Sequence, residues 1–279
     1  MTSLPSSGTS STPVASGSSF YTAMRILPRA QREGMYAIYA FCRAVDDIAD
    51  DGGPRSERLA ALDRWRTDID RLYRGGGETE LTQGLRAPIE AFGLEQADFL
   101  AVIDGMEMDV RRDIRAPDWQ QLDLYCDRVA SAVGRLSVRI FGLDEANGFA
   151  LSHHLGRALQ MTNILRDLDE DAAIGRLYLP REALAEAGIA HQDVATVLAD
   201  PSLDKACGIV AERARSHFDA AESTMARCAR NNVRSPRLMA AVYRPMLDKL
   251  VSRGWRPPRH KLRHSTPLII WAVFRHGLI

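Results

Sequence analysis

Asp46 and Asp50 stand four positions apart in the stretch IYAFCRAVDDIADD, residues 38–51. In an α-helix such positions lie on the same face, about 6 Å apart along the axis. Two like charges at this spacing destabilise a helix by roughly 0.2–0.5 kcal/mol, and a bound cation would turn that repulsion into attraction. The pair is therefore a candidate metal site, although acidic residues on a helix more often form a solvated face.

A second group of oxygen-bearing side chains lies more than a hundred residues later, in QMTNILRDLDED, residues 160–171. Asn163, Asp167 and Asp171 follow one another at the same four-residue spacing. Carboxylate and amide oxygens without histidine or cysteine suit Mg²⁺, which takes one or two carboxylates and fills its other positions with water and phosphate oxygens. The second group thus predicts the same chemistry as the first.

Each acidic group is accompanied by an arginine, Arg43 in the first and Arg166 in the second. Guanidinium groups neutralise phosphate oxygens through forked hydrogen bonds. Apolar residues precede both groups, which a solvated face does not explain. Together the two groups indicate a site in which several magnesium ions and the arginines hold a diphosphate.

The overall composition limits the partners and the domain organisation. Lysine plus arginine number 36 and aspartate plus glutamate also number 36, so no basic field favours nucleic acid as a partner. The 279 residues can bury a large core with a deep pocket. Residues 1–17 are rich in Ser, Thr, Gly and Pro, and we expect a disordered tail followed by one domain over 18–279. The four cysteines are widely separated and predict reduced thiols in a cytoplasmic protein.

Apolar residues recur at three- and four-residue spacing and alternating runs are scarce, which predicts an all-α fold. The late stretch PLIIWAVF falls far short of the ~20 residues needed to cross a bilayer. A terminal helix packed on the core is expected there, with a peripheral membrane contact as the alternative. The predicted helices span 19–27, 29–50, 55–73, 80–92, 95–110, 118–141, 145–171, 180–187, 202–231, 235–253 and 268–276.

These motifs resemble those of the squalene and phytoene synthase family, the head-to-head branch of the isoprenoid synthases. The resemblance extends in the family's order from about Ser18 to the C-terminus. It implies one α-helical domain around a central apolar cavity, with the two aspartate-rich motifs facing each other across its mouth. The matching stretches are SSFYTAMRILPRAQREGMYAIYAFCRAVDDIADD, LYCDRVASAVG, ALQMTNILRDLDEDAAIGRLYLP and VYRPMLDKLVSRGW.

The resemblance also implies a role for each matching side chain. Arg43 and Arg166 would act catalytically by neutralising a leaving diphosphate, whereas Asp47 and Asp51 receive no role as ligands. The metal ligands would be Asp46, Asp50, Asn163, Asp167 and Asp171. The side chains in contact with diphosphate or its hydration shell would be Ser19, Tyr39, Arg43, Gln160, Arg166 and Tyr243.

The chain departs from the family pattern at two places. Where the family usually has consecutive arginines that contact a diphosphate, residues 259–261 read Arg, His and Lys, and Arg259 is taken as the contact. The family's glycine shortly after the YC pair is replaced by Ser131, which concerns the local backbone rather than the function.

The implied reaction is a Mg²⁺-dependent condensation of two prenyl diphosphates. Loss of diphosphate leaves an allylic carbocation, which the 2,3-double bond of the second substrate attacks before proton loss closes a cyclopropane. Metal ions and arginines stabilise the leaving group, and the cavity excludes water. Tyr125 would relay the proton or is an aromatic residue of the core, and the leaving diphosphate is the other candidate base.

Within the family, the sequence is most similar to bacterial members that convert farnesyl diphosphate to presqualene diphosphate for hopanoid biosynthesis. That similarity implies no need for NADPH, partners among the downstream enzymes of the pathway, and a cytoplasmic or peripheral inner-membrane location. The alternatives are a phytoene or dehydrosqualene synthase, an NADPH-dependent squalene synthase, a terpene cyclase, and a helical binding module without enzymatic activity.

Two further groups of polar residues receive structural interpretations. His153 and His154 are adjacent, and adjacent helical positions do not share a face, so a metal site formed by this pair is not expected. Four acids are expected to form a solvated or arginine-paired face, with a supporting role near the site as the alternative. They are Asp104, Glu107, Asp109 and Asp113.

Overall fold

The computed structural model describes residues 24–190, 193–260 and 262, which are mainly helical. Apart from an isolated bridge between Arg115 and Leu177, this part of the chain contains no β-structure. The all-α fold is therefore confirmed. No helix within the described ranges is long and apolar enough to cross a membrane.

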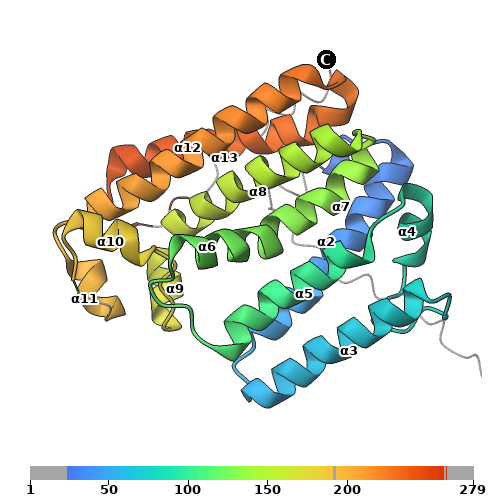
Figure 1. Cartoon of the computed structure of the whole chain (residues 1–279), viewed down its shortest axis with the longest axis horizontal. Helices are drawn as coiled ribbons and strands as arrows, with labels where there is room; N and C mark the ends of the chain where they lie inside the picture. Colours follow the sequence, from blue (N-terminus) through green and yellow to red (C-terminus); the bar gives the residue numbers. More distant parts are fainter. Residues whose placement is uncertain (1–23, 191–192, 261, 263–279) are drawn as a thin grey trace, which may run out of the picture.

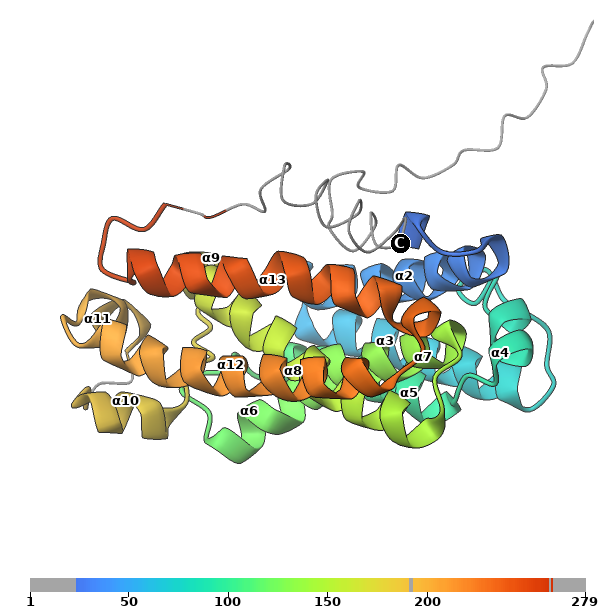
Figure 2. The same cartoon turned by 90° about the horizontal axis from the view of Figure 1, so that it is seen from above.

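The long helices run side by side. In Figure 1, α12 and α13 lie along one edge of the bundle, α3 lies along the opposite edge, and α8, α7 and α5 lie between them. In Figure 2, α13 and α2 form one side of the bundle and α6 lies on the other. The helices are α2 (Arg29–Asp50), α3 (Arg55–Tyr73), α4 (Arg86–Phe92), α5 (Gln96–Arg111), α6 (Trp119–Cys126), α7 (Ala132–Phe141), α8 (Glu145–Arg166), α9 (Leu168–Ala173), α10 (Arg181–Ala187), α11 (Val194–Ala199), α12 (Leu203–Arg227) and α13 (Arg234–Arg253), with a π-helix η1 (Asp127–Ser131) and a 3₁₀-helix η2 (Arg230–Val233).

Several predicted boundaries are wrong for identifiable reasons. The helix expected over 80–92 begins only at Arg86, because Gly84 has a φ of 84° and cannot continue a right-handed helix. The short helix α11 was not expected, although the Asp193 carboxylate accepts a hydrogen bond from the Thr196 amide as an N-cap. The helix expected over 118–141 is divided by the π-helix η1, and the one over 202–231 ends at Arg227.

The helix expected over 145–171 is interrupted at Asp167, which has φ −103° and ψ 20° and separates α8 from α9. The hydrogen bonds nevertheless continue across the break. The Asp167 amide donates to the Asn163 carbonyl and the Asp171 amide donates to the Asp167 carbonyl, both at 2.9 Å. Asn163, Asp167 and Asp171 therefore still follow one another at one helical turn each, despite the break.

Some predictions fall outside the described residues. They are the disordered tail over 1–17, Ser19 and the helix over 268–276. Of the helix expected over 19–27, residues 24–27 are described: Met24 and Arg25 are helical, whereas Ile26 and Leu27 lie in a turn and a bend.

Helix α8 is the central element of the packing. It contacts α6, η1, α7, α12 and α13, and its buried residues, among them Leu151, Gly156 and Ile164, lie on more than one side. A separate apolar cluster joins α2, α3 and α5, where Phe41 meets Trp65 and Phe99 edge to face at centroid distances of 5.3 and 5.1 Å. The apolar contacts of α8 and the cluster of α2, α3 and α5 hold in place the helices that carry the acidic motifs.

Small residues let α8 approach the π-helix closely. A Cβ atom added to Gly156 would lie 2.8 Å from both the backbone N and the Cα of Ser131. Ser131 itself has φ −70° and ψ −32°, an ordinary helical conformation that needs no glycine. Its hydroxyl accepts a hydrogen bond from Nη1 of Arg157 at 3.0 Å. The departure from the family's glycine is thus accommodated without backbone strain.

Replacement of Gly156 by alanine should destabilise the protein, because the new methyl group meets backbone atoms that can move only if two helices separate. We expect the free energy of unfolding of Gly156→Ala to fall by roughly 1–3 kcal/mol in urea titrations. Gly208 is the matched control, since it lies within α12 and an added Cβ would meet nothing within 4 Å. Gly208→Ala should stabilise by about 0.5–1 kcal/mol, and equal effects of the two substitutions would contradict the close-packing argument.

Candidate active site

The two acidic motifs line one polar cavity of about 130 Å³. Residues of α2, α5, α6, α8 and α9 contribute to its wall, together with the segment after α9. All five side chains predicted as metal ligands are present in this wall. The lining residues are Asp46, Ala49, Asp50, Asp109, Tyr125, Gln160, Asn163, Ile164, Asp167, Asp171, Arg176 and Tyr178.

On α2 the structure separates the four aspartates into two roles. Asp46 and Asp50 line the cavity, and Asp46 also accepts a hydrogen bond from Arg43 at 2.7 Å. Asp47 is exposed and accepts a second bond from Arg43, whereas Asp51 accepts from the Gly53 amide at 3.3 Å. Neither Asp47 nor Asp51 belongs to the cavity wall.

Asn163 supplies a test of whether this cavity fits a metal ion. Its Oδ1 atom is buried and has no hydrogen-bond partner, a costly state for a polar atom unless a ligand completes it. Four aspartates of the two motifs face the same space and offer oxygen ligands only. Such a set of hard oxygens suits Mg²⁺, so the residues present fit the ion that the motifs predict.

Arg176 connects the two motifs and was not among the predicted site residues. Its Nη1 donates to Asp50 of α2 at 3.2 Å, and its backbone amide donates to the Asp171 carbonyl at 2.8 Å. Its Nε lies 3.9 Å from Asp109 Oδ1 and has no hydrogen-bond partner of its own. The arginine in GRLYLP, directly after the second motif, was the available sequence signal.

Asp109 is the centre of a buried polar group, which corrects the expectation that it belongs to a solvated face. Its side chain is 5% exposed, and its two oxygens accept hydrogen bonds from Tyr178 at 2.7 Å and Tyr125 at 2.9 Å. The stacked phenol rings have centroids 4.8 Å apart. Glu107, in contrast, pairs with Arg66 and Arg111 as an arginine-paired face would.

Tyr125 has the burial of a core residue, and its predicted role as a proton relay stays a prediction. It is buried in the core, as an aromatic packing residue would be, and it also lines the polar cavity. Burial, followed by the charge of Asp109, raises the pKa of Tyr125 well above its usual value. The phenol is therefore a proton donor to Asp109 rather than a phenolate.

The charges in the cavity oppose one another in the absence of a cation. Burial, followed by the charge of Asp50, raises the pKa of Asp46 to about 6. Burial and the nearby Asp167 raise the pKa of Asp171 to about 7. Burial and the neighbouring negative charge both disfavour the ionised carboxylates, whereas the positive charge of a bound divalent ion would favour them.

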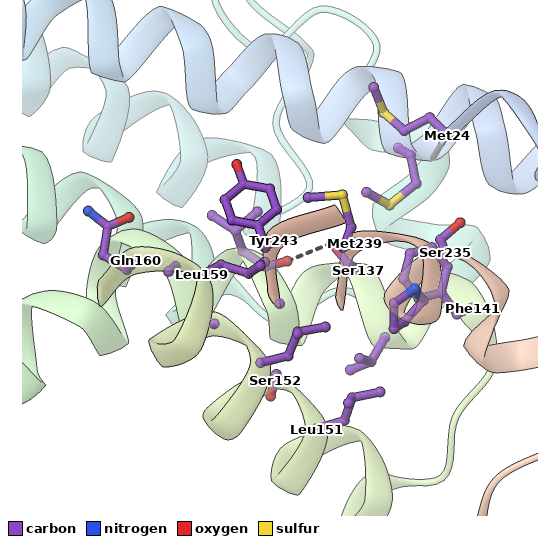
Figure 3. Close-up of a pocket in the computed structure, with 18 of the residues that line it drawn as sticks. Met24, Ser137, Phe141, Leu151, Ser152, Leu159, Gln160, Ser235, Met239 and Tyr243 are labelled. Atoms are coloured by element: carbon purple, nitrogen blue, oxygen red, sulfur yellow. Dashed lines mark hydrogen bonds between the residues drawn. The ribbon is translucent and has the colours of Figure 1, made fainter. Parts of the chain in front are cut away.

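A second cavity, of about 260 Å³ and mainly apolar, adjoins the polar one. Gln160 and Asn163 of α8 line both. Figure 3 shows Gln160 and Tyr243 toward one side of this cavity and Met24 and Phe141 toward the other. The apolar residues come from α2, η1, α7, α8 and α13, so the cavity lies inside the bundle as the family fold implies.

The serines in the apolar cavity do not make it polar. The Ser137 hydroxyl donates to the Val133 carbonyl at 2.7 Å (Figure 3). The Ser152 hydroxyl donates to the Phe149 carbonyl at 2.9 Å. Each hydroxyl is thus used by its own helix. The wall presents carbon and sulfur atoms to most of the enclosed space.

Arg166 and Tyr39, two of the other predicted diphosphate contacts, are not in the wall of the polar cavity. Arg166 forms a bidentate pair with Asp167, and this pair and Tyr243 raise the pKa of Arg166 despite its burial. Tyr39 is half-buried on α2 and packs on the apolar cluster of that helix, outside the wall of either cavity. Ser19 is outside the described residues.

Arg259 lies in a separate hollow with Arg166 and Arg253 rather than in the polar cavity. It forms a salt bridge of 2.6 Å with Asp169 and donates to the Trp255 carbonyl at 2.7 Å. The predicted diphosphate contact of Arg259 stays a prediction. To contact a diphosphate, Arg259 would have to give up its salt bridge to Asp169.

The family description that matches this chain, over residues 14–267, is squalene/phytoene synthase. The chain belongs to this family. A presqualene diphosphate synthase from Rhodopseudomonas palustris is 59% identical over 266 residues, 95% of each chain. The presqualene diphosphate synthase from Zymomonas mobilis is 53% identical over 94% of this chain and 89% of the relative.

Solved structures agree with the family assignment. The crystal structure of squalene synthase HpnC from Alicyclobacillus acidocaldarius superimposes with a TM-score of 0.78 at 30% identity, covering 85% of this chain and 89% of the other. A dehydrosqualene synthase in complex with a ligand gives a TM-score of 0.81 at 25% identity, over 93% and 90% of the two chains. The predicted isoprenoid-synthase bundle of the squalene/phytoene synthase family is confirmed.

The metal-free protein should gain stability when Asp171 loses its charge. A carboxyl pKa near 7 in the folded state, against about 3.9 in the unfolded chain, means that the folded state binds more protons and that stability falls as pH rises from about 4 to 7. At pH 8 without divalent metal, Asp171→Asn should raise the free energy of unfolding by roughly 1–2 kcal/mol, and the difference should shrink toward pH 4.5. Urea titrations at both pH values measure it.

Asp123→Asn is the control with the opposite sign. The hydrogen bonds from Arg157 lower the pKa of Asp123, so its charge stabilises the folded state above pH 4. This substitution should destabilise at pH 8. A stabilisation by Asp123→Asn, or a destabilisation by Asp171→Asn, would contradict the inference that the ionised carboxylates of the cavity destabilise the metal-free protein.

Proposed function

We propose that this chain condenses two molecules of farnesyl diphosphate to presqualene diphosphate, with release of one diphosphate and with Mg²⁺ as cofactor. The observation that carries the proposal is the junction of the two cavities at Gln160 and Asn163. There an oxygen-lined cavity, suited to metal and diphosphate, adjoins an apolar cavity suited to a hydrocarbon chain. The relatives at 53–59% identity are named presqualene diphosphate synthases, and these names are the reason for proposing this product rather than another of the family.

The polar cavity would hold the diphosphate of the ionising substrate. Asp46, Asp50, Asn163, Asp167 and Asp171 would hold several magnesium ions, which supply electrostatic stabilisation of the leaving diphosphate. Arg43 and Arg166, each beside one motif, would add forked hydrogen bonds to the phosphate oxygens. Gln160 lines both cavities and Tyr243 lines the apolar one, and both would contact the diphosphate or its hydration shell.

Arg176 adds a positioning role to those expected from the sequence. It joins Asp50 to the backbone of Asp171 and so holds the two motifs at a fixed separation. Arg176 belongs to the wall of the polar cavity, and its Nε is buried without a hydrogen-bond partner. A phosphate oxygen bound in the cavity would supply that partner.

The apolar cavity would keep water from the allylic cation while the second substrate attacks it. The hydroxyls of Ser137 and Ser152 are hydrogen-bonded to carbonyls of their own helices. Proton loss then closes the cyclopropane. Tyr125, hydrogen-bonded to Asp109 and Tyr178, would pass that proton on, and the diphosphate is the alternative base.

The proposed product retains one diphosphate and requires no reduction, so NADPH is not part of the reaction. A cytoplasmic location, possible contact with the surface of the inner membrane and cooperation with enzymes that consume the product belong to the same proposal. The four cysteines, all free thiols, are in keeping with a reducing compartment.

The product decides between this proposal and its relatives. Purified protein incubated with farnesyl diphosphate and Mg²⁺, with and without NADPH, should yield presqualene diphosphate in the polar fraction in both cases. Chromatography of polar and hydrocarbon fractions measures it. Dehydrosqualene formed without NADPH, or squalene formed only with NADPH, would overturn the proposed product. A product from one substrate molecule would instead indicate a terpene cyclase.

The acidic motifs should be required for turnover and dispensable for folding. Asp46→Ala and Asp167→Ala each remove an oxygen ligand from the polar cavity, and we expect turnover to fall by roughly 10²–10³-fold with the helical circular dichroism unchanged. Asp47→Ala is the matched control, because Asp47 is adjacent in sequence but lies outside the cavity wall. Full activity in the first two variants would favour a helical binding module without enzymatic function.

A further inference from the structure

Three histidine rings converge at the edge of the contact between α8 and α12. His153 and His154 are adjacent on α8, and His217 comes from α12, which lies beside α8 in the bundle (Figure 1). Nδ1 of His154 and Nδ1 of His217 are 3.0 Å apart, and one ring nitrogen from each of the three residues lies within 4.8 Å of the other two. The pair on α8 gains its third ring only through the packing of α12.

The helix packing places these rings. On α12, Ala214, Phe218 and Ala221 are buried, and His217 stands half-buried next to Phe218 at the border of that apolar stripe. His153 and His154 occupy the corresponding border of α8. Their ring planes are 87° apart with centroids separated by 4.8 Å, so adjacent residues present their rings to one region from different directions.

The spacing is close to that of a metal site. In a tetrahedral zinc site with Zn–N bonds of about 2.0–2.1 Å, two ligand nitrogens are about 3.3 Å apart. The pair formed by His154 and His217 is within a few tenths of an ångström of this value. His153 needs a side-chain adjustment of about an ångström or more to join them, which a half-buried ring at a helix surface can make.

Two guanidinium groups, those of Arg157 and Arg213, act on the rings and help to lower the pKa of His217. Arg157, one turn after His153, is paired with Asp123 at 2.7 and 2.8 Å and with Asp127 at 3.2 Å. These two carboxylates offset the charge of Arg157. Burial, followed by the charges of the other two histidines, lowers the pKa of His217 to about 4, which leaves its ring neutral at pH 7.

We propose that His153, His154 and His217 bind a transition-metal ion that prefers nitrogen ligands, Zn²⁺ in the first place, with water in the fourth position. Imidazole ligands select such ions, whereas Mg²⁺ prefers the oxygens of the other cavity. The two sites are separate, since His154 and Asn163 stand nine residues apart on α8, about 14 Å along its axis. The bound ion would fasten α8, which carries the second acidic motif, to α12.

The experiment uses the full chain, freed of metal with a chelator and returned to buffer with excess Mg²⁺ to occupy the oxygen site. Co²⁺ is the probe, because its visible absorption reports a tetrahedral nitrogen environment, and Zn²⁺ is then added as the competitor. We expect one Co²⁺ per chain, displaced by Zn²⁺, and a higher melting temperature with Zn²⁺. His153→Gln, His154→Gln and His217→Gln should each weaken binding by more than roughly tenfold.

Two control variants separate this site from other sources of binding. His260→Gln removes an exposed histidine outside the cluster, and Asp167→Asn removes a ligand of the oxygen cavity. Both should bind Co²⁺ as the wild type does. If Co²⁺ bound to the wild type lacks the visible absorption of a tetrahedral site, the proposal is overturned whatever the variants show. Binding that survives His217→Gln but is lost in Asp167→Asn would also overturn it.

Discussion

Five carboxylate groups share the polar cavity with one positively charged side chain, Arg176, among the described residues of its wall. This concentration of like charge in a half-buried space is unfavourable by itself, as the raised pKa values of Asp46 and Asp171 show. Arg176 reduces the repulsion by bonding to Asp50 and approaching Asp109, while its backbone amide binds the Asp171 carbonyl. The deficit of positive charge that remains is what suits the cavity to divalent cations.

The same helix forms the wall of both cavities. On α8, Ser152, Leu155 and Leu159 line the apolar cavity, and one turn further Gln160 and Asn163 belong to both. The wall therefore changes from carbon to oxygen within a single turn, where the reacting allylic carbon would lie between diphosphate and hydrocarbon. Gly156 keeps α8 close enough to Ser131 for the π-helix to contribute Val129 and Ala130 to the same cavity. Small residues in α8 thus affect the shape of the apolar cavity as well as the stability of the bundle.

The buried group of Asp109, Tyr125 and Tyr178 joins packing to chemistry. Each phenol is held by the carboxylate of Asp109, so the two rings are fixed in position as well as buried. A network in which every member has a partner is rigid, so the two phenols are held in fixed positions at the wall of the polar cavity. The squalene/phytoene synthase fold supplies this arrangement from three segments, α5, α6 and the GRLYLP stretch, that are distant in sequence.

The sequence by itself determined the features that depend on local geometry. Helical periodicity predicted the all-α fold and the shared faces of Asp46 with Asp50 and of Asn163 with Asp167 and Asp171, because positions four apart in a helix are neighbours whatever surrounds them. Motif order predicted the family. The roles of the individual ligands stay predictions, although the structure brings all five into one cavity. Only the tertiary structure decided that Asp109 is buried, that Arg176 joins the motifs and that His217 meets His153 and His154. Each of these depends on which helix packs against which face, and helix packing is set by contacts between segments far apart in the chain, which the spacing of residues along one helix does not specify.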